Sequence, residues 1–561
     1  MKYTHLLPAS LTIALLAIFT PTQVQAQGFS SPSRVSGNFQ LDAQYYRSDT
    51  LIGAPDVGEK MLMNAFTNLL YTQGDFTAGL RFESYLNPIS GYDPRLEGTG
   101  MPYRFISYKT GDFEITAGNF YEQFGNGLIL RTYEDWNLGI DNSLDGVRVK
   151  FNPMQGIALK GVYGKQRYFW DKSPGIIRGF DADFSVNDLI KPLKENSTRI
   201  FAGAGIVSKY QKDEFIIADP GFRLDLPRNV SAFAGRFNVS TTNFNFTGEY
   251  AHKINDPSSI NNFIYKPGQS LYLTGTYFRP GLSVMLSAKH TDNMSFKTRR
   301  TEASSALDIN FLPPLTKQHT YKLSSMYPYA TQPNGEVAYQ GQVIYTIKRN
   351  TKAGGPYGTY ITANYSMVHA LNRKPMNDSI AIGQRGTLGY DAGLFDASDE
   401  KYFSDFNIEI SRRMNRNLKI SLQYLNLYYN IAVIEGHPGE PAVKAHIGIT
   451  DIQYKLTPTK TLRFELQHLY TEQDKGNWAA AMMEYTIAPK WFFSLSDEFN
   501  YGNTDKDKRL HYYNASMGYT HHSSRIAFTW GRQREGIVCV GGVCRYVPAS
   551  SGLMLTITSS F

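Results

Sequence analysis

Short runs in which apolar and polar residues alternate recur along the chain. In the run at 76–82, Phe76, Ala78, Leu80 and Phe82 alternate with Thr77, Gly79 and Arg81. Because successive strand side chains point to opposite faces, this pattern predicts a strand with one apolar and one polar face. The same alternation predicts strands around residues 282–289, 418–424 and 462–467. Charged residues recur on the polar faces, which indicates a wet interior and disfavours the apolar core of a sandwich.

The connections between these strands alternate between short turns and longer loops, which is typical of transmembrane β-barrels. The short turns are expected at residues 279–281, 415–417, 489–490 and 522–523, and the long extracellular loops at about 122–143, 213–228, 372–401 and 430–444. The sequence therefore predicts an all-β fold, a single large antiparallel transmembrane β-barrel of the outer-membrane type over residues 34–561. We count about 26 strands, within a range of about 22–28, with the weakest alternation near Phe120, Asp181 and Leu307.

The end of the chain is itself a predicted strand. Leu553, Leu555, Ile557 and Phe561 share one parity, and Met554, Thr556, Thr558 and Ser560 share the other. Its length matches the ~9–11 residues with which a tilted strand crosses a bilayer. This end resembles the C-terminal signal strand of bacterial outer-membrane barrels, whose terminal Phe is read by the barrel-assembly machinery. The resemblance implies that this machinery is a partner during biogenesis.

The start of the chain has the pattern of a secretory signal peptide. Lys2 precedes a short apolar run at 11–19, and small residues at Val24 and Ala26 predict cleavage after residue 26. The apolar run is shorter than the ~20 residues of a membrane helix. Residues 27–33 then form a short periplasmic segment, which leaves no room for an N-terminal plug domain. We expect export to the bacterial outer membrane, with both termini periplasmic.

The composition agrees with a barrel. Aromatic residues make up 14% of the chain, with 38 Tyr and 34 Phe, and such rings form girdles at membrane interfaces. The net charge of +8 is spread along the chain, which predicts no nucleic-acid partner. Outer-membrane lipid and lipopolysaccharide are the expected surroundings.

The two cysteines lie in one predicted hairpin, Cys539-Val-Gly-Gly-Val-Cys544. The Gly-Gly pair suits a primed two-residue turn, which would place the cysteines opposite each other as a closely spaced, non-hydrogen-bonded pair. An exported compartment favours a disulfide between Cys539 and Cys544. A reduced pair and a metal site remain as alternatives.

The sequence contains no motif of a hydrolase, metalloprotease, P-loop or dinucleotide site, so we predict no enzyme, no cofactor and no metal site. One segment, at 120–145, is too apolar for a mobile loop and carries many charges. Its candidate lumen or constriction residues are Glu122, Arg131, Glu134, Asp135 and Asp141. One interpretation folds this segment into the lumen, with Arg131 as the principal contact; the other is an ordinary extracellular loop or an extra hairpin.

Three stretches of the chain carry a family resemblance. These are F-Y-E-Q-F-G-N-G-L-I-L-R at 120–131, S-L-D-G-V-R-V-K at 143–150 and G-I-V-C-V-G-G-V-C-R at 536–545. They resemble an outer-membrane β-barrel family of Bacteroidota, a family of the DUF6029 type. The resemblance implies a fold and a compartment, but it supplies no catalytic residues. Around Thr50 and Ser379, D-T-L and D-S-I are similar to the short O-glycosylation motif of exported Bacteroidota proteins.

Two functions are compatible with the sequence. The first is a porin-like channel whose charged lumen passes polar solutes, because barrels above ~16 strands leave an aqueous lumen unless something fills it. The second is a non-enzymatic subunit of an assembly, export or secretion complex, whose extracellular loops bind surface lipoproteins or other barrels. A fold alone does not decide between them.

Overall fold

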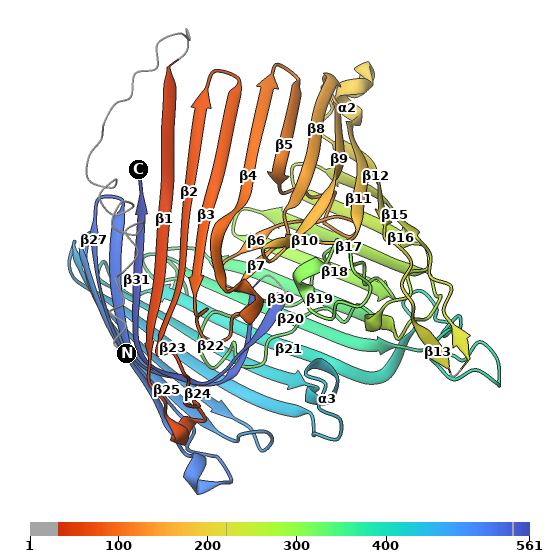
Figure 1. The fold of residues 1–561 in the computed structure, drawn as a ribbon. Coiled ribbons are helices and arrows are strands. Elements are labelled where there is room, and N and C mark those ends of the chain that lie inside the picture. The colour runs from red at the N-terminus through yellow and green to blue at the C-terminus, as the bar shows by residue number, and fades with distance from the viewer. Residues whose placement is uncertain (1–31, 220, 541–542) are drawn as a thin grey trace, which may run out of the picture.

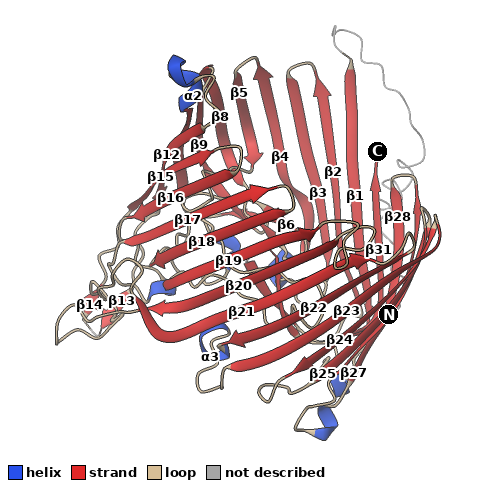
Figure 2. Ribbon diagram, turned by 180° about the vertical axis from the view of Figure 1, so that it is seen from behind, coloured by secondary structure: helices blue, strands red, loops and turns tan. Residues whose placement is uncertain are grey.

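The computed structural model of the protein describes residues 32–219, 221–540 and 543–561. The predicted signal peptide, residues 1–26, and residues 27–31 of the predicted periplasmic segment lie outside the described residues. Most of the described elements are strands (Figure 2). In the described part of the chain, no helix is both long and apolar enough to cross a membrane.

The strands form a closed barrel. One antiparallel sheet of 25 strands closes where β1, which also pairs with β2, meets β31, with register from Asn38↔Ser560 to Tyr46↔Gly552 (Figure 1). The two-residue β10 (Asp171–Lys172) only extends the edge of β9, so the barrel itself has 24 strands. The expected count of about 26 is therefore too high.

The first half of the barrel consists of β1 (Ser33–Tyr46), β2 (Met61–Gln73), β3 (Phe76–Leu86), β4 (Gly98–Thr110), β5 (Phe113–Phe120), β8 (Leu144–Met154), β9 (Ile157–Tyr168), β11 (Ile176–Ser185), β12 (Arg199–Tyr210), β15 (Asn229–Ser240), β16 (Phe244–Lys253) and β17 (Gly268–Arg279). The second half consists of β18 (Leu282–Asp292), β19 (Gly335–Ile347), β20 (Thr359–Leu371), β21 (Ala397–Arg413), β22 (Leu418–Tyr429), β23 (Val443–Thr457), β24 (Lys460–Tyr470), β25 (Trp478–Ile487), β26 (Trp491–Phe499), β27 (His511–His521), β28 (Ser524–Gln533) and β31 (Ser550–Ser560).

The remaining elements belong to the connections. Three small hairpins pair β6 (Glu134–Asp135) with β7 (Ile140–Asp141), β13 (Ile217–Asp219) with β14 (Phe222–Arg223), and β29 (Gly536–Val540) with β30 (Val543–Val547). The two single-turn α-helices are α2 (Val186–Leu189) and α3 (Ile431–Ile434), and the 3-10 turns are η1 (Thr50–Ile52), η2 (Pro94–Leu96), η3 (Lys191–Leu193), η4 (Ser259–Asn261), η5 (Ser305–Leu307) and η6 (Lys506–Lys508).

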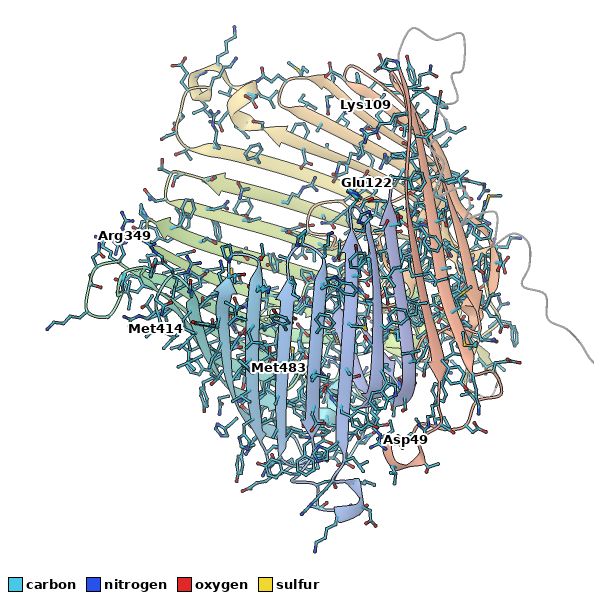
Figure 3. All side chains as sticks on the ribbon, turned by 90° about the vertical axis from the view of Figure 1, so that its left-hand side faces the viewer. Asp49, Lys109, Glu122, Arg349, Met414 and Met483 are labelled. Carbon is cyan, nitrogen blue, oxygen red and sulfur yellow. A yellow bond between two sulfur atoms is a disulfide. The ribbon has the colours of Figure 1, made fainter. Side chains whose placement is uncertain are left out.

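The two ends of the barrel differ. At one end, the short-turn end, most neighbouring strands are joined by tight turns such as 74–75 and 280–281, and the chain also ends there. The other end, the long-loop end, carries connections such as 293–334 and 372–396. Figure 3 labels Asp49 at the long-loop end and Lys109 towards the short-turn end. The four loops expected from sequence run between strands at 121–143, 211–228, 372–396 and 430–442, so their bounds shift by a few residues.

The expected strand near Leu307 is absent. Because β18 and β19 pair directly, with Asp292 opposite Gly335, no residue of the connection 293–334 forms part of the barrel wall. Leu307 sits there in the single turn η5 and is buried. The sequence analysis did not single out this connection as a long loop.

The two faces of the wall follow the predicted alternation. Phe76, Leu80 and Phe82 of β3 are exposed on the outer face, whereas Arg81 between them is only 4% exposed. Met483, labelled at mid-height in Figure 3, is likewise exposed. The outer face is thus apolar and the inner face is largely polar.

Candidate functional site in the barrel lumen

Two connections fold into the lumen from the long-loop end. We name residues 121–143 the first inner segment and residues 293–334 the second inner segment. They bond to each other through Arg131 N to Ile309 O at 2.8 Å and Phe311 N to Gly127 O at 2.9 Å. The side chain of Asn310 adds a bond to the carbonyl of Leu128 at 3.1 Å. Together they form one body inside the wall, in which β6 and β7 can be followed in Figure 1.

The tip of the first inner segment is anchored in an apolar cluster. Phe124, Leu128, Ile129 and Leu130 are fully buried against inward residues of β9, β11, β12 and β15. Glycines of the wall make room for the tip, since a Cβ at Gly179 would lie 2.9 Å from the Phe124 ring. The tip also carries a carboxylate contact, because Glu249 of β16 accepts bonds from the backbone N and side-chain Nδ2 of Asn126 at 2.7 and 2.8 Å.

Gly125 is required at this tip, and Gly125→Ala tests the anchoring. Its φ is +52°, and an added Cβ would lie 2.6 Å from Glu249 Oε2. We expect the substitution to lower the free energy of unfolding by about 1–3 kcal/mol, measured by urea unfolding in detergent micelles. Gly161→Ala in β9 is the matched control, because nothing lies within 4 Å of its added Cβ. Equal stability of the two variants would contradict this anchoring.

A buried network of ion pairs joins the first inner segment to the wall. Arg167 of β9 bridges Glu83 of β3 and Asp141 of the segment, with N–O distances of 2.6 and 2.7 Å. Arg81 of β3 pairs with Asp141 at 2.7 Å and also with Glu134. The side chain of Glu83 is 0% exposed. Removing Arg167 would leave buried Glu83 with Arg81 alone, at 3.6 Å, so its charge would be poorly compensated.

The two carboxylates that the segment contributes to this network, Glu134 and Asp141, have net pKa shifts in opposite directions. Burial raises the pKa of Glu134, although Arg81 acts against that effect. Burial also favours neutral Asp141, but Arg167 and Arg81 outweigh it, so the pKa of Asp141 is lowered. Asp141 therefore remains the charged centre of the network.

The other sequence-predicted residues of this segment have separate roles. Glu122 lies near three cations, with N–O distances of 3.7 Å to Arg148, 3.2 Å to Lys150 and 3.3 Å to Lys160. Asp135 accepts a bond from Leu138 N at 3.2 Å within its own turn, so its contact is local. The structure thus brings Glu134 and Asp141 together and leaves Glu122 and Asp135 apart from them.

Arg131 has no ion-pair partner among the described residues. Its guanidinium carbon lies 4.0 Å from the ring centroid of Phe311 and 4.7 Å from that of Tyr133. Burial lowers the pKa of this side chain, which is half-buried. The two rings therefore hold the guanidinium through cation–π contacts.

The second inner segment lies along the wall from β18 to β26. His319 Nε2 is 2.7 Å from Asp405 Oδ2 of β21, Tyr321 donates to Asp451 of β23 at 3.2 Å, and Lys322 pairs with Glu498 of β26 at 2.8 Å. Its apolar residues pack on an apolar part of the inner wall. That cluster includes Leu315, Leu323, Met326, Tyr327 and Tyr329 of the segment and Leu425, Leu427, Val443, Ile447 and Trp478 of the wall.

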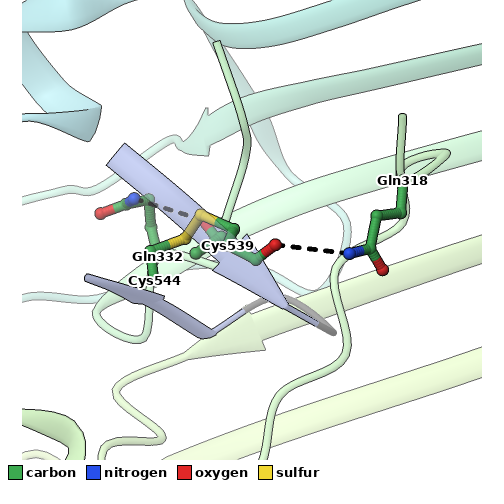
Figure 4. The surroundings of a disulfide bond; sticks show 5 residues. Gln318, Gln332, Cys539 and Cys544 are labelled. Carbon is green, nitrogen blue, oxygen red and sulfur yellow. Dashed lines mark hydrogen bonds between the residues drawn. A yellow bond between two sulfur atoms is a disulfide. The ribbon is translucent and has the colours of Figure 1, made fainter. Parts of the chain in front are cut away.

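The disulfide prediction is confirmed: Cys539 and Cys544 are opposite each other in the β29–β30 hairpin and are bonded. The hairpin contacts the second inner segment, where Gln318 Nε2 donates a hydrogen bond to the carbonyl of Cys539 at 3.3 Å (Figure 4). At the hairpin base, Arg534 Nε lies 3.2 Å from Glu498, which also forms an ion pair with Lys322. Glu498 therefore links wall, hairpin and second inner segment.

One side of the inner wall has a different environment. On β1, β27, β28 and β31, which we name the open wall, many inward residues are small and polar and remain at least partly exposed. They include Asn38, Gln40, Asp42, Asn514, Ser516, Thr529, Thr556 and Thr558. By contrast, the inward polar residues Ser366 of β20 and Asp405 of β21 are 0% exposed. The inner segments thus cover much of the lumen wall and leave the open wall accessible to water.

Three adjoining cavities lead from the long-loop end to this wall. The largest, of about 860 Å³, lies among the long loops and the hairpin. Its neighbours, of about 440 and 310 Å³, lie against the second inner segment and against Asn514 of the open wall. Arg534 and Ile537 line all three cavities, so the hairpin base stands where they meet.

The remaining predicted site residues lie at the two ends. Leu553, Leu555 and Ile557 belong to the outer face of β31, and Phe561 at the chain end is 59% exposed. Thr50 and Ser379 are exposed in the connections 47–60 and 372–396. Their roles in assembly and in glycosylation stay predictions.

The closed barrel places the chain among β-barrels of the outer-membrane type. A family model described as "Family of unknown function (DUF6029)" matches residues 7–561, and the chain belongs to this family. No curated protein sequence matches the chain.

Several solved barrels are similar to it in fold. The siderophore receptor PirA from Pseudomonas aeruginosa has 10% identity and a TM-score of 0.42, over 94% of this chain and 80% of that one. The P pilus usher (PapC) translocation pore has 9% identity and a TM-score of 0.39, over 94% and 99%. OccD3 (OpdP) from Pseudomonas aeruginosa has 10% identity and a TM-score of 0.32, over 96% and 93%. At this identity, the similarity extends to the fold alone.

Proposed function

We propose that this protein is an outer-membrane channel that passes small polar solutes along the open wall. In this proposal the apolar outer face lies in the bilayer, the long-loop end is extracellular and both chain ends are periplasmic. The observation that carries it is the partial exposure of the small polar residues of the open wall, whereas polar residues of β20 and β21 such as Ser366 and Asp405 are buried. Fully hydrogen-bonded packing would be expected on all sides if the inner segments sealed the barrel.

The inner segments narrow the passage and do not belong to a separate plug domain. The first is held by the Arg81 and Arg167 network and by Glu249, and the second by Asp405, Asp451 and Glu498. A passage bounded by such fixed side chains selects solutes by size and charge. Planar-bilayer recordings of the purified protein test this function; steady ohmic steps support it, and a silent barrel contradicts it.

Arg131 is expected to favour anions in this passage. Arg131→Gln removes a cation that lacks an ion-pair partner among the described residues. One charge about 10 Å away in water changes the energy of each ion by roughly 0.4 kcal/mol, in opposite directions for chloride and potassium, so the chloride-to-potassium permeability ratio should fall by about fourfold. Reversal potentials in a KCl gradient measure this ratio. Arg131→Lys keeps the charge and should keep the ratio, whereas an unchanged ratio in Arg131→Gln would place Arg131 outside the passage.

An apolar patch on the long loops favours a second candidate function, a subunit of an outer-membrane complex. Phe215 and Phe222 at the β13–β14 hairpin are 73% and 72% exposed. The patch continues onto the neighbouring loop, where Gly386 lies against Ala218 and where Leu388 is exposed. Exposed apolar patches of this kind mark protein contacts. In this alternative, Phe215→Ser with Phe222→Ser releases a stoichiometric partner that co-purifies with the unsubstituted protein.

A further inference from the structure

The cavity of about 860 Å³ at the long-loop end has the size and the mixed lining of a ligand site. This volume falls within the ~300–1,000 Å³ range of small-ligand pockets. Its lining comes from the connections 430–442 and 471–477, from the disulfide hairpin with its base, and from Met326 and Tyr327 of the second inner segment. Ile431 and Ile434 of α3, together with Met326 and Trp478, give it an apolar part.

One cation of this cavity forms no direct ion pair with the described residues. Arg545, next to Cys544 on β30, has no carboxylate within 4.0 Å among them, and the more distant charge of Asp135 acts on it. Its Nε and Nη1 are buried and, within the described chain, lack hydrogen-bond partners. Its guanidinium lies on the Tyr92 ring, 4.1 Å from the centroid. Burying a guanidinium without a carboxylate partner costs folding free energy, and the carboxylate of a bound ligand would offset this cost by pairing with the guanidinium.

Three acidic residues of the cavity, in turn, have no lysine or arginine partner in the described part of the chain. They are Glu435, Glu440 and Asp474. The other two cations are already engaged: Lys475 lies 2.8 Å from Glu535, and Arg534 lies 3.2 Å from Glu498. The cavity therefore has an excess of negative charge, with one separate positive site at Arg545.

The cavity lining also contains a hydrogen-bond donor, unpartnered within the described chain, that could bind a peptide carbonyl. Trp478 is 2% exposed, and its Nε1 has no hydrogen-bond partner among the described residues. A buried indole N–H usually finds an acceptor, and a peptide carbonyl is such an acceptor. A hydroxyl-rich sugar would use this donor too, but it would leave both Arg545 and the acids without counter-ions.

We propose that this cavity binds short basic peptides, whose C-terminal carboxylate pairs with Arg545 and whose ammonium groups face Glu435, Glu440 and Asp474. The site opens to the long-loop end and adjoins the proposed passage at Arg534, so it would take peptides at the entrance. Binding requires only the folded barrel and does not depend on conduction.

Titration calorimetry on the disulfide-intact full chain in detergent at low salt tests the proposal. Trilysine with a free carboxylate should bind, trilysine amide should bind roughly tenfold more weakly, and triglutamate and maltotriose should not bind. Equal binding of trilysine and its amide would overturn the role of Arg545. Binding of triglutamate or maltotriose in preference to trilysine would overturn the peptide assignment.

Arg545→Gln should remove the difference between trilysine and its amide. Arg349→Gln is the control, because Arg349 is exposed in the connection 348–358 at the opposite end (Figure 3). A persistent tenfold preference for the free carboxylate in Arg545→Gln would overturn the proposal. Because the measurement needs no membrane, a protein that binds trilysine but conducts no ions would refute the channel and leave the peptide site standing.

Discussion

Replacing residues 294–333 with a four-residue glycine-serine turn should raise the single-channel conductance by roughly an order of magnitude. The wall would remain closed, because Asp292 and Gly335 are opposite each other in the β18–β19 ladder and a tight turn can join them. The second inner segment covers the inner wall from β18 to β26, and its removal would expose a wide lumen to water. Planar-bilayer recordings of the two proteins, matched for orientation and salt, measure the ratio.

A shortened external loop provides the control for this deletion. Residues 376–382 of the connection 372–396 are mostly exposed, so their replacement should leave the conductance unchanged. The deletion should also lower stability, since it uncovers Leu425, Leu427 and other apolar residues of the inner wall. Unchanged conductance in a deletion variant that keeps its barrel would show that the second inner segment does not narrow the passage.

Arg167→Met should lower the free energy of unfolding by about 3–5 kcal/mol, the cost of breaking a buried ion pair. Arg167 holds Glu83 of the wall and Asp141 of the first inner segment, and its side chain is 4% exposed. Without it, two buried carboxylates lose their shared partner. Urea unfolding in detergent micelles, followed by tryptophan fluorescence, measures the loss.

Arg104→Met is the matched control for this substitution. Arg104 also pairs with an aspartate, Asp145, but at 3.7 Å and with 59% of its side chain exposed. Exposed pairs contribute about 0–1 kcal/mol, so this variant should stay near the original stability. Similar losses of unfolding free energy in both variants would mean that the buried network contributes no more to stability than an exposed ion pair.

The wall could be predicted from the sequence because each strand carries its own signal. The alternation at 76–82 and 418–424 depends only on the period of a strand, and the structure places those faces as expected. The Cys539 and Cys544 pairing was equally local, since the hairpin and its turn occupy one short stretch. Local patterns of this kind need no knowledge of the rest of the fold.

The filling of the lumen could not be predicted in the same way, because it depends on contacts between distant residues. The connection 293–334 has no strand period, and its partners Asp405, Asp451 and Glu498 lie far along the chain. One signal was present: Leu425 and Leu427 are apolar although they belong to the inward parity of their strand. An apolar inward face in a predicted wet barrel requires an internal cover.

The charged residues of the first inner segment were likewise predictable in their local pattern but not in their distant contacts. Their density at 120–145 marked the segment as unusual, but no local rule could assign Asp141 to Arg81 and Arg167, which come from β3 and β9. Glycine positions were also ambiguous. Only the folded barrel shows that Gly125 faces Glu249 while Gly161 faces open space.

The most direct test of a passage along the open wall is the accessibility of single cysteines during conduction. Ser516→Cys places a thiol on the open wall, and Ser366→Cys places one on the covered wall, where the native side chain is 0% exposed. The native disulfide leaves no other free thiol. A charged methanethiosulfonate reagent added during bilayer recording should lower the conductance of Ser516→Cys and leave Ser366→Cys unchanged. Block of Ser366→Cys with no effect on Ser516→Cys, or no conductance in either protein, would contradict a channel that follows the open wall.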